Sequence, residues 1–158
     1  MAPPDVTVRL RKRLDARLGA GHPWVYRDAL DAFTARPGDV VTVRDDEGRF
    51  VARGLADDGP IAARIWSLRD EPVSPALFAA RVTQALDLRR RVVPAETDAY
   101  RVLHGENDRT PGFVCDVYGT YAVLALDGAG ATAWRDVMTE ALRAPLEARG
   151  VTSLLVRT

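Results

Sequence analysis

The sequence predicts an α+β protein in two parts: a small β-barrel-like domain over residues 1–71 and a small α/β domain, in strand–helix–strand order, over residues 72–158. Short segments of alternating apolar and polar residues, joined by turn-forming residues, fill the first part. Pro72 and the pair Ser74-Pro75 then open a stretch of helical periodicity, which marks the boundary. A chain of 158 residues suits one domain or two small ones.

The first part begins with a strand whose outer face carries cations. Val6, Val8 and Leu10 alternate with polar residues and should face a core, which leaves Arg9 and Arg11 in solvent. The other elements expected here are a helical turn at 13–18, a short turn or helix at 25–30, and strands at 40–44, 50–55 and 61–66. The connections DDEG and ADDGP have turn chemistry, so these strands should form one small barrel-like sheet.

The second part reads as helix, strands, helix and strand. Ser74 should cap a helix that ends before Pro94. The strands are expected at 100–105, 112–118 and 121–126, a second helix runs from Trp134 to Pro145, which should kink or end it, and a last strand begins after Gly150. Because the chain stops inside that last strand, we expect a fragment of a longer protein.

Charge is distributed unevenly along a chain whose formal net charge is zero. Residues 6–27 hold six Lys/Arg and one Asp, a local charge of +5. Such a cluster can bind phosphates, although a run of charge is more often a solvated face. The cluster therefore favours a nucleic-acid surface without proving one.

Other function classes are excluded by composition. A single cysteine, Cys115, rules out an intramolecular disulfide and a cysteine-based zinc site within one chain, and we expect no metal site. No apolar run approaches the ~18 residues that span a bilayer. The N-terminus also lacks the apolar core of a signal peptide, so we expect a cytoplasmic protein with no membrane partner.

The stretch GHPWVY, residues 21–26, has two interpretations. In one it is an RNA-facing loop, where a glycine approaches a phosphate and an aromatic ring stacks on an unpaired base. In the other, Trp24 and Tyr26 plug the barrel core and Pro23 fixes their entry, since aromatic residues supply much of the burial in small domains. We expect Trp24 to be mostly buried and His22 to be the surface contact.

Two stretches together resemble one protein family. The first is RLRKRLDARLGAGHPWVYRDAL followed by PGDVVTVRDDEGRFVARGLAD and ARIWS, and the second is YRVLHGENDRTPGFVCDVYG followed by a strand. In this order and spacing they resemble the front half of bacterial large-subunit rRNA (cytosine-5-) methyltransferases. That family joins an N-terminal PUA domain, a central α/β domain and a C-terminal Rossmann-like domain. The resemblance covers essentially all 158 residues.

The resemblance implies a PUA-like RNA-binding domain at 1–71 and a central domain at 72–158, which grip and orient 23S ribosomal RNA. The family's S-adenosylmethionine-binding loop and catalytic cysteines lie beyond the point where this chain stops, and no G-x-G-x-x-G follows a strand here. We therefore expect no catalytic residue and no bound cofactor in this chain, and S-adenosylmethionine only in a full-length enzyme; whether this chain is itself an enzyme stays open. The RNA contacts implied are Arg9, Arg11, Lys12, Arg13, Arg17, His22 and Arg27.

Three further features are better explained by structure than by chemistry. His104-Gly105-Glu106-Asn107-Asp108 could be an acid/base set, but we expect a loop whose acids cap backbone N–H groups and pair with Arg101 or Arg109. The glycines of Asp127–Gly130 should form the loop before a helix. Cys115 alternates with apolar neighbours on a strand and should be a buried thiol.

Two rival functions remain open at this point. The chain could be a stand-alone RNA-binding module or partner subunit, with catalysis on a separate chain. It could also be a protein-interaction scaffold without a nucleic-acid role. The sequence does not choose between a monomer and a homodimer.

Overall fold

The computed structural model describes residues 5–11 and 13–158. The chain forms two compact units. One extends as far as Val73 and includes the later segment Gly128–Ala133, and the other comprises Ser74–Asp127 and Trp134–Thr158. Helices and strands are mixed in the chain, which confirms the α+β class.

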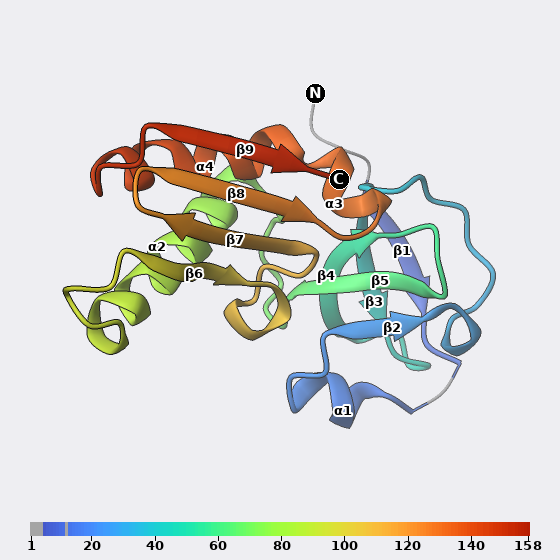
Figure 1. Cartoon of the computed structure of the whole chain (residues 1–158). Helices are drawn as coiled ribbons and strands as arrows, with labels where there is room; N and C mark the ends of the chain where they lie inside the picture. Colours follow the sequence, from blue (N-terminus) through green and yellow to red (C-terminus); the bar gives the residue numbers. More distant parts are fainter. Residues whose placement is uncertain (1–4, 12) are drawn as a thin grey trace. The chain divides into compact units, whose positions relative to one another are not determined.

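The first unit is built on a five-stranded sheet in the order β1-β3-β4-β5-β2 (Figure 1). Its strands are β1 (Asp5–Arg9), β2 (Trp24–Tyr26), β3 (Val40–Arg44), β4 (Phe50–Ala56) and β5 (Ile61–Ser67). β1 runs parallel to β3, and the other neighbours are antiparallel. Hydrogen bonds from Arg11 N to Ala29 O (2.8 Å) and from Asp31 N to Arg9 O (2.9 Å) join the chain after β1 to the chain after β2. These bonds draw the two sheet edges together, as a barrel-like domain requires.

Small and β-branched residues fill the core of this unit. Val8, Val25, Val41, Val43 and Ala63 are all at most 3% exposed. These five residues come from four of the five strands, β1, β2, β3 and β5. Two short helical segments, α1 (Asp15–Gly19) and η1 (Arg27–Ala29), flank β2.

The second unit packs helices on one face of a four-stranded sheet (Figure 1). The strands are β6 (Ala99–His104), β7 (Phe113–Tyr118), β8 (Tyr121–Leu126) and β9 (Ser153–Arg157), with β9 parallel to β8. The helices are α2 (Pro75–Val92) and α4 (Arg135–Glu147), with η2 (Gly105–Asp108) after β6. Phe78 joins the layers, because its ring stacks on Trp134 (5.1 Å between centroids) and meets Phe113 edge-on (5.7 Å).

Sequence patterns placed most of these elements and missed two details. β2 is a strand where a turn or helix was expected, and α3 (Ala129–Ala133) is a helix where a loop was expected. Of the two effects expected of Pro145, it does not end α4, which continues to Glu147. Ser74 does cap α2, since its hydroxyl accepts a hydrogen bond from Leu77 N (3.4 Å).

Two classes of structure are not found in the described part of the chain. Among residues 5–11 and 13–158, no helix has the length and apolar character that crossing a membrane requires. The same residues contain no group of three or more His, Cys, Asp or Glu side chains placed to hold a metal ion.

Candidate nucleic-acid interface

The cationic strand face predicted from the sequence is present at β1. Val8 and Leu10 are buried, so the intervening Arg9 and the following Arg11 extend into solvent. Arg11 is weakly paired, with 3.9 Å between its Nε and the Asp31 carboxylate and with both side chains more than half exposed. Its charge therefore remains available to a ligand. Lys12, predicted to act with these arginines, lies outside the described residues.

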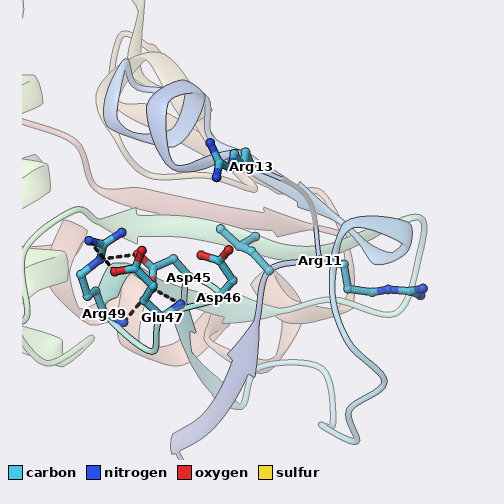
Figure 2. A pocket seen from close by; sticks show the side chains of 7 residues that line it. Arg11, Arg13, Asp45, Asp46, Glu47 and Arg49 are labelled. Carbon is cyan, nitrogen blue, oxygen red and sulfur yellow. Dashed lines mark hydrogen bonds and ion pairs between the residues drawn. The ribbon is translucent and has the colours of Figure 1, made fainter.

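A cavity of about 240 Å³ lies beside this segment (Figure 2). Leu10, Arg11 and Arg13 line it from one part of the chain, and the acidic turn Asp45-Asp46-Glu47 with Arg49 lines it from another. In Figure 2 the Arg11 guanidinium points away from the acidic side chains, while Arg13 stands across from them. Arg13 therefore stands opposite the negative charge of this turn, whereas the acid near Arg11 is Asp31.

Arg49 neutralises part of the acidic turn. Its Nε lies 2.7 Å from Asp45 and its Nη1 2.8 Å from Glu47. The hydrogen bond from Arg49 lowers the pKa of Asp45 against the opposing effect of burial, so this carboxylate stays ionised. Asp45 also accepts backbone hydrogen bonds from Glu47 and Arg49, which closes the turn. The turn is thus held by its own hydrogen bonds and ion pairs, and Asp46 adds a further negative charge that acts on Arg49.

The helix α1 and the turn before β2 carry Arg17 and His22, and both side chains are exposed. The two residues are linked, because His22 N donates to Arg17 O (3.0 Å). The adjacent turn is pinned to the sheet by a hydrogen bond from Ile65 N to Pro23 O (2.8 Å). Two of the predicted RNA contacts therefore lie close to each other on a fixed backbone.

Trp24 is partly buried and lies outside the buried core, so the prediction that it plugs the barrel core is wrong. Val25 is the residue of β2 that enters the core, at 0% exposed, and strand alternation turns Trp24 and Tyr26 to the opposite face. Trp24 is half-buried there and Tyr26 is 41% exposed. The tryptophan that this unit buries is Trp66, at 2%. The spacing His22, Trp24, Tyr26 was the signal in the sequence for an aromatic outer face.

Arg27 supports the loop that follows β4. Its Nη2 donates to Asp57 O (2.9 Å) and Gly59 O (3.3 Å), and its guanidinium lies 5.7 Å from the Phe33 ring centroid. The side chain is exposed, so it holds a fixed positive charge directly after Tyr26. Its predicted RNA contact stays a prediction, as do those of Arg9, Arg11, Arg13, Arg17 and His22.

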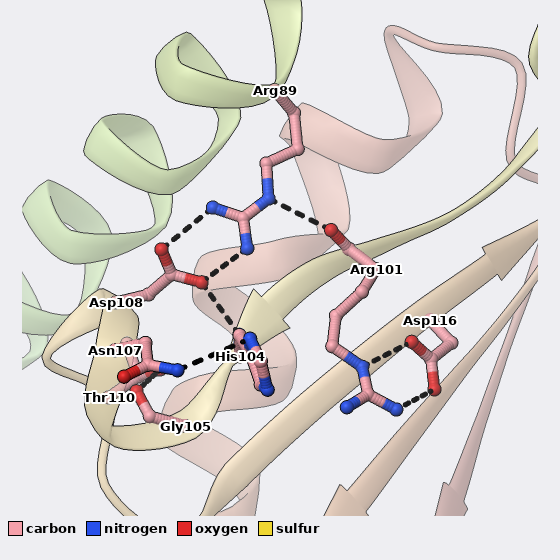
Figure 3. Close-up of polar contacts among 8 residues, drawn as sticks. All are labelled: Arg89, Arg101, His104, Gly105, Asn107, Asp108, Thr110 and Asp116. Carbon is pink, nitrogen blue, oxygen red and sulfur yellow. Dashed lines mark hydrogen bonds and ion pairs between the residues drawn. The ribbon is translucent and has the colours of Figure 1, made fainter. Parts of the chain in front are cut away.

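The loop after β6 is held by ion pairs and backbone hydrogen bonds (Figure 3), but the arginine that pairs with Asp108 is Arg89 and not the expected Arg101 or Arg109. Arg89 from α2 binds both oxygens of Asp108 (2.7 and 2.6 Å), and Asp108 also accepts from His104 N (2.7 Å). Arg89 Nε donates to Arg101 O (2.9 Å), which ties α2 to β6. These contacts commit Asp108 to structure and leave no acid/base pair of Asp108 with the His104 ring.

Cys115 is a buried thiol, in agreement with the sequence. It is 0% exposed on β7, and burial, with a smaller effect from Asp116, raises its pKa to about 12. A thiol with that pKa is not a nucleophile near neutral pH.

Comparison with known proteins shows which proteins this chain resembles. Residues 8–68 match the family described as PUA-like domain. The ribosomal RNA large subunit methyltransferase I of Alteromonas mediterranea is 36% identical over 140 residues, covering 85% of this chain and 35% of the relative. The protein of the same name from Salmonella arizonae is 34% identical, covering 85% of this chain and 34% of the relative.

The chain contains a PUA-like domain and is homologous to the ribosomal RNA large subunit methyltransferase I proteins. This confirms the relationship predicted from the two sequence stretches. The chain spans about a third of the length of the curated relatives that it matches.

Solved structures share the fold of this methyltransferase homologue. A protein from Streptococcus mutans, assigned as a SAM-dependent methyltransferase, superposes with a TM-score of 0.81 over 96% of this chain and 41% of its own, at 15% identity. SMU.776, assigned as a methyltransferase and solved with SAH, gives a TM-score of 0.80 over 98% of this chain and 40% of its own, at 16% identity. At these identities the likeness concerns the fold.

Proposed function

We propose that this chain is the RNA-binding and RNA-orienting N-terminal part of an S-adenosylmethionine-dependent 23S rRNA (cytosine-5-) methyltransferase that acts in the cytoplasm. The observation that carries the proposal is the exposure of Arg9, Arg11, Arg13 and Arg17, which lie within the stretch matching a PUA-like domain. The names of the homologous proteins supply the RNA class.

The cations of this segment are suited to phosphates. Arginine offers several donors in a planar fork that fits a phosphate, and its charge does not titrate near neutral pH. Phosphate contacts of this kind give affinity that is independent of base sequence and falls with salt. The segment would therefore hold an RNA backbone, and any choice of the target nucleotide would come from other contacts.

Methyl transfer belongs to a part of the family's proteins that this chain does not match. In the family, methyl transfer uses a nucleophilic cysteine and a glycine-rich loop that binds the cofactor. Cys115 is too buried and too weakly acidic to be that nucleophile. We expect the isolated chain neither to bind S-adenosylmethionine nor to methylate RNA. Calorimetry with S-adenosylmethionine checks this expectation, and micromolar binding would contradict it.

The RNA-binding role is tested with a pair of double variants. Arg11→Ala with Arg13→Ala removes two charges from the proposed surface. Arg135→Ala with Arg143→Ala removes two charges from α4, where the side chains are similarly exposed, at 52% and 59%. Filter binding to a large-subunit rRNA transcript over a range of salt should show the slope of log affinity against log salt reduced by about 1.4–1.8 in the first variant only. An equal effect of both variants would contradict the placement of the surface.

A further inference from the structure

The outer face of β2 carries three aromatic rings in a row. His22, Trp24 and Tyr26 alternate with inward or turn residues, and neighbouring ring centroids are 6.2 Å and 6.4 Å apart. Both contacts are edge-to-face, with interplanar angles of 70° and 85°. The separation of Trp24 and Tyr26 matches the two-residue repeat of a strand, roughly 6.6 Å, so this pair follows from strand geometry, and His22 extends the row from the turn before β2.

This row is exposed at its two ends. His22 is exposed and Tyr26 is 41% exposed, while Trp24 between them is half-buried. Trp24 therefore serves as the fixed centre that orients the two outer rings through edge-to-face contacts, which aromatic pairs favour. Contact of aromatic rings with water is unfavourable. Several exposed rings side by side therefore indicate a binding surface, whereas a single exposed apolar residue does not.

The backbone holds the row in a set position. Pro23 O accepts a hydrogen bond from Ile65 N (2.8 Å), and Arg27 N donates to Pro60 O (2.9 Å), so both ends of β2 are tied to β5 or to the turn before it. The register between β2 and β5 shifts between Val25 and Tyr26. Such bulges re-aim a side chain at a sheet edge. Among the described residues β2 is the last strand in the sheet order, and the hydrogen bonds that join the two sheet edges lie beyond its end, at Ala29 and Asp31.

Positive charge lies at both ends of the row. Arg17 precedes it and accepts the His22 N–H at its carbonyl (3.0 Å), and Arg27 follows Tyr26 directly with its guanidinium held by two carbonyl oxygens. Aromatic rings flanked by cations are the combination that binds unpaired nucleotides, because bases stack on the rings while phosphates meet the charges. A duplex hides its base faces, so it cannot use the rings in this way.

We propose that His22, Trp24 and Tyr26 form a stacking surface for unpaired bases of RNA, with Tyr26 as the main contact and Arg17 and Arg27 as phosphate partners. The proposal rests on the RNA-binding function proposed above and adds a preference: the chain binds a loop, bulge or single strand more tightly than a duplex. The phosphate contacts of Arg11 and Arg13 do not depend on it.

The test compares two RNA probes and four variants of the full chain. The probes are a short fluorescent oligouridylate, which forms no duplex, and a blunt self-complementary RNA duplex. Tyr26→Ala and Tyr26→Leu remove the ring, Tyr26→Phe keeps it, and Tyr121→Ala is the matched control, because Tyr121 is 55% exposed on the second unit. Thermal melts establish that each variant folds, and Tyr26→Leu keeps apolar bulk in case alanine perturbs β2.

We expect Tyr26→Ala and Tyr26→Leu to weaken oligouridylate binding about 5-fold or more. A loss of about 5-fold is the lower end of the range for losing the stacking of one base on an aromatic ring. Tyr26→Phe and Tyr121→Ala should bind the oligouridylate as tightly as the parent chain does. The slope of log affinity against log salt should be the same in all four variants and the parent chain. The duplex should bind more weakly than the oligouridylate and be insensitive to Tyr26. Unchanged oligouridylate affinity in Tyr26→Leu would overturn the stacking surface while leaving the RNA-binding proposal intact, whereas a parent chain that binds neither probe would overturn both.

Discussion

Asp57 shows at the scale of one residue how this chain joins distant segments. Its carboxylate accepts from Arg64 Nε (2.8 Å), from Asp58 N (3.1 Å) and from Gly130 N (3.1 Å), the last of these 73 residues away in the sequence. The Asp57 side chain is 4% exposed and that of Arg64 is 9% exposed. Loss of one partner would leave a buried charge unpaired.

Asp57→Asn should therefore lower the free energy of unfolding by about 3–5 kcal/mol. The matched control is Asp136→Asn, which breaks an ion pair with Arg135 in which the aspartate is 84% exposed, and it should cost less than about 1 kcal/mol. Urea unfolding followed by tryptophan fluorescence measures both. Equal losses in the two variants would show that the Asp57 contacts contribute no more than a surface pair.

Asp57 should also make stability depend on acid pH. Burial by itself raises the pKa of Asp57, but the hydrogen bonds from Arg64, Gly130 and Asp58 outweigh burial and leave the pKa below its ordinary value. A carboxyl with a lowered folded-state pKa stabilises the fold above its unfolded pKa of about 3.9 and loses that effect as pH falls through the folded value. Urea midpoints should fall below about pH 4 in the parent chain, and less steeply in Asp57→Asn. Parallel pH profiles would count against this linkage.

At the scale of elements, β4 and β5 approach each other most closely at Gly54. A Cβ placed on Gly54 would collide with the Arg64 carbonyl oxygen, where the register of the two strands also shifts. Gly54→Ala should cost about 1–3 kcal/mol, because the backbone of β5 must move. Gly59→Ala is the control, since nothing lies within 4 Å of its Cβ position, and should change stability by less than about 0.5 kcal/mol. Thermal melts that rank the two variants the other way would contradict this account of the strand pair.

Elements with strong local signals were predictable from the sequence, and those fixed by distant contacts were not. β3, β4 and β5 have alternation and turn residues, and α2 has Ser74 and Pro75 at its start, so their positions were close. α3 is five residues long and its Gly130 is bound by Asp57, a contact that no local pattern reveals. At the candidate site, the exposure of Arg9 and Arg11 followed from alternation, but the same rule was not applied to Trp24 and Tyr26. Burial was assigned there by residue type, although Val25 takes the inward position.

At the scale of the whole molecule, the proposed binding of RNA rests on the homology of the chain and on the distribution of its charge. The chain is homologous over most of its length to ribosomal RNA large subunit methyltransferase I proteins. The match covers about a third of the length of those proteins. Its net charge is zero, so attraction to RNA cannot come from the molecule as a whole. The proposed attraction would come from the local excess of cations in residues 6–27, which makes the salt dependence of binding informative.

The most direct test of this central claim is the dissociation constant of the isolated chain for a large-subunit rRNA transcript, measured by filter binding across a range of salt concentrations. If Arg9, Arg11, Arg13 and Arg17 each meet a phosphate, log affinity should fall against log salt with a slope of about 2.8 or steeper. Saturable binding with that slope is the predicted result. Absence of saturable binding at low salt, or a slope near zero, would contradict the claim that this cationic segment binds RNA.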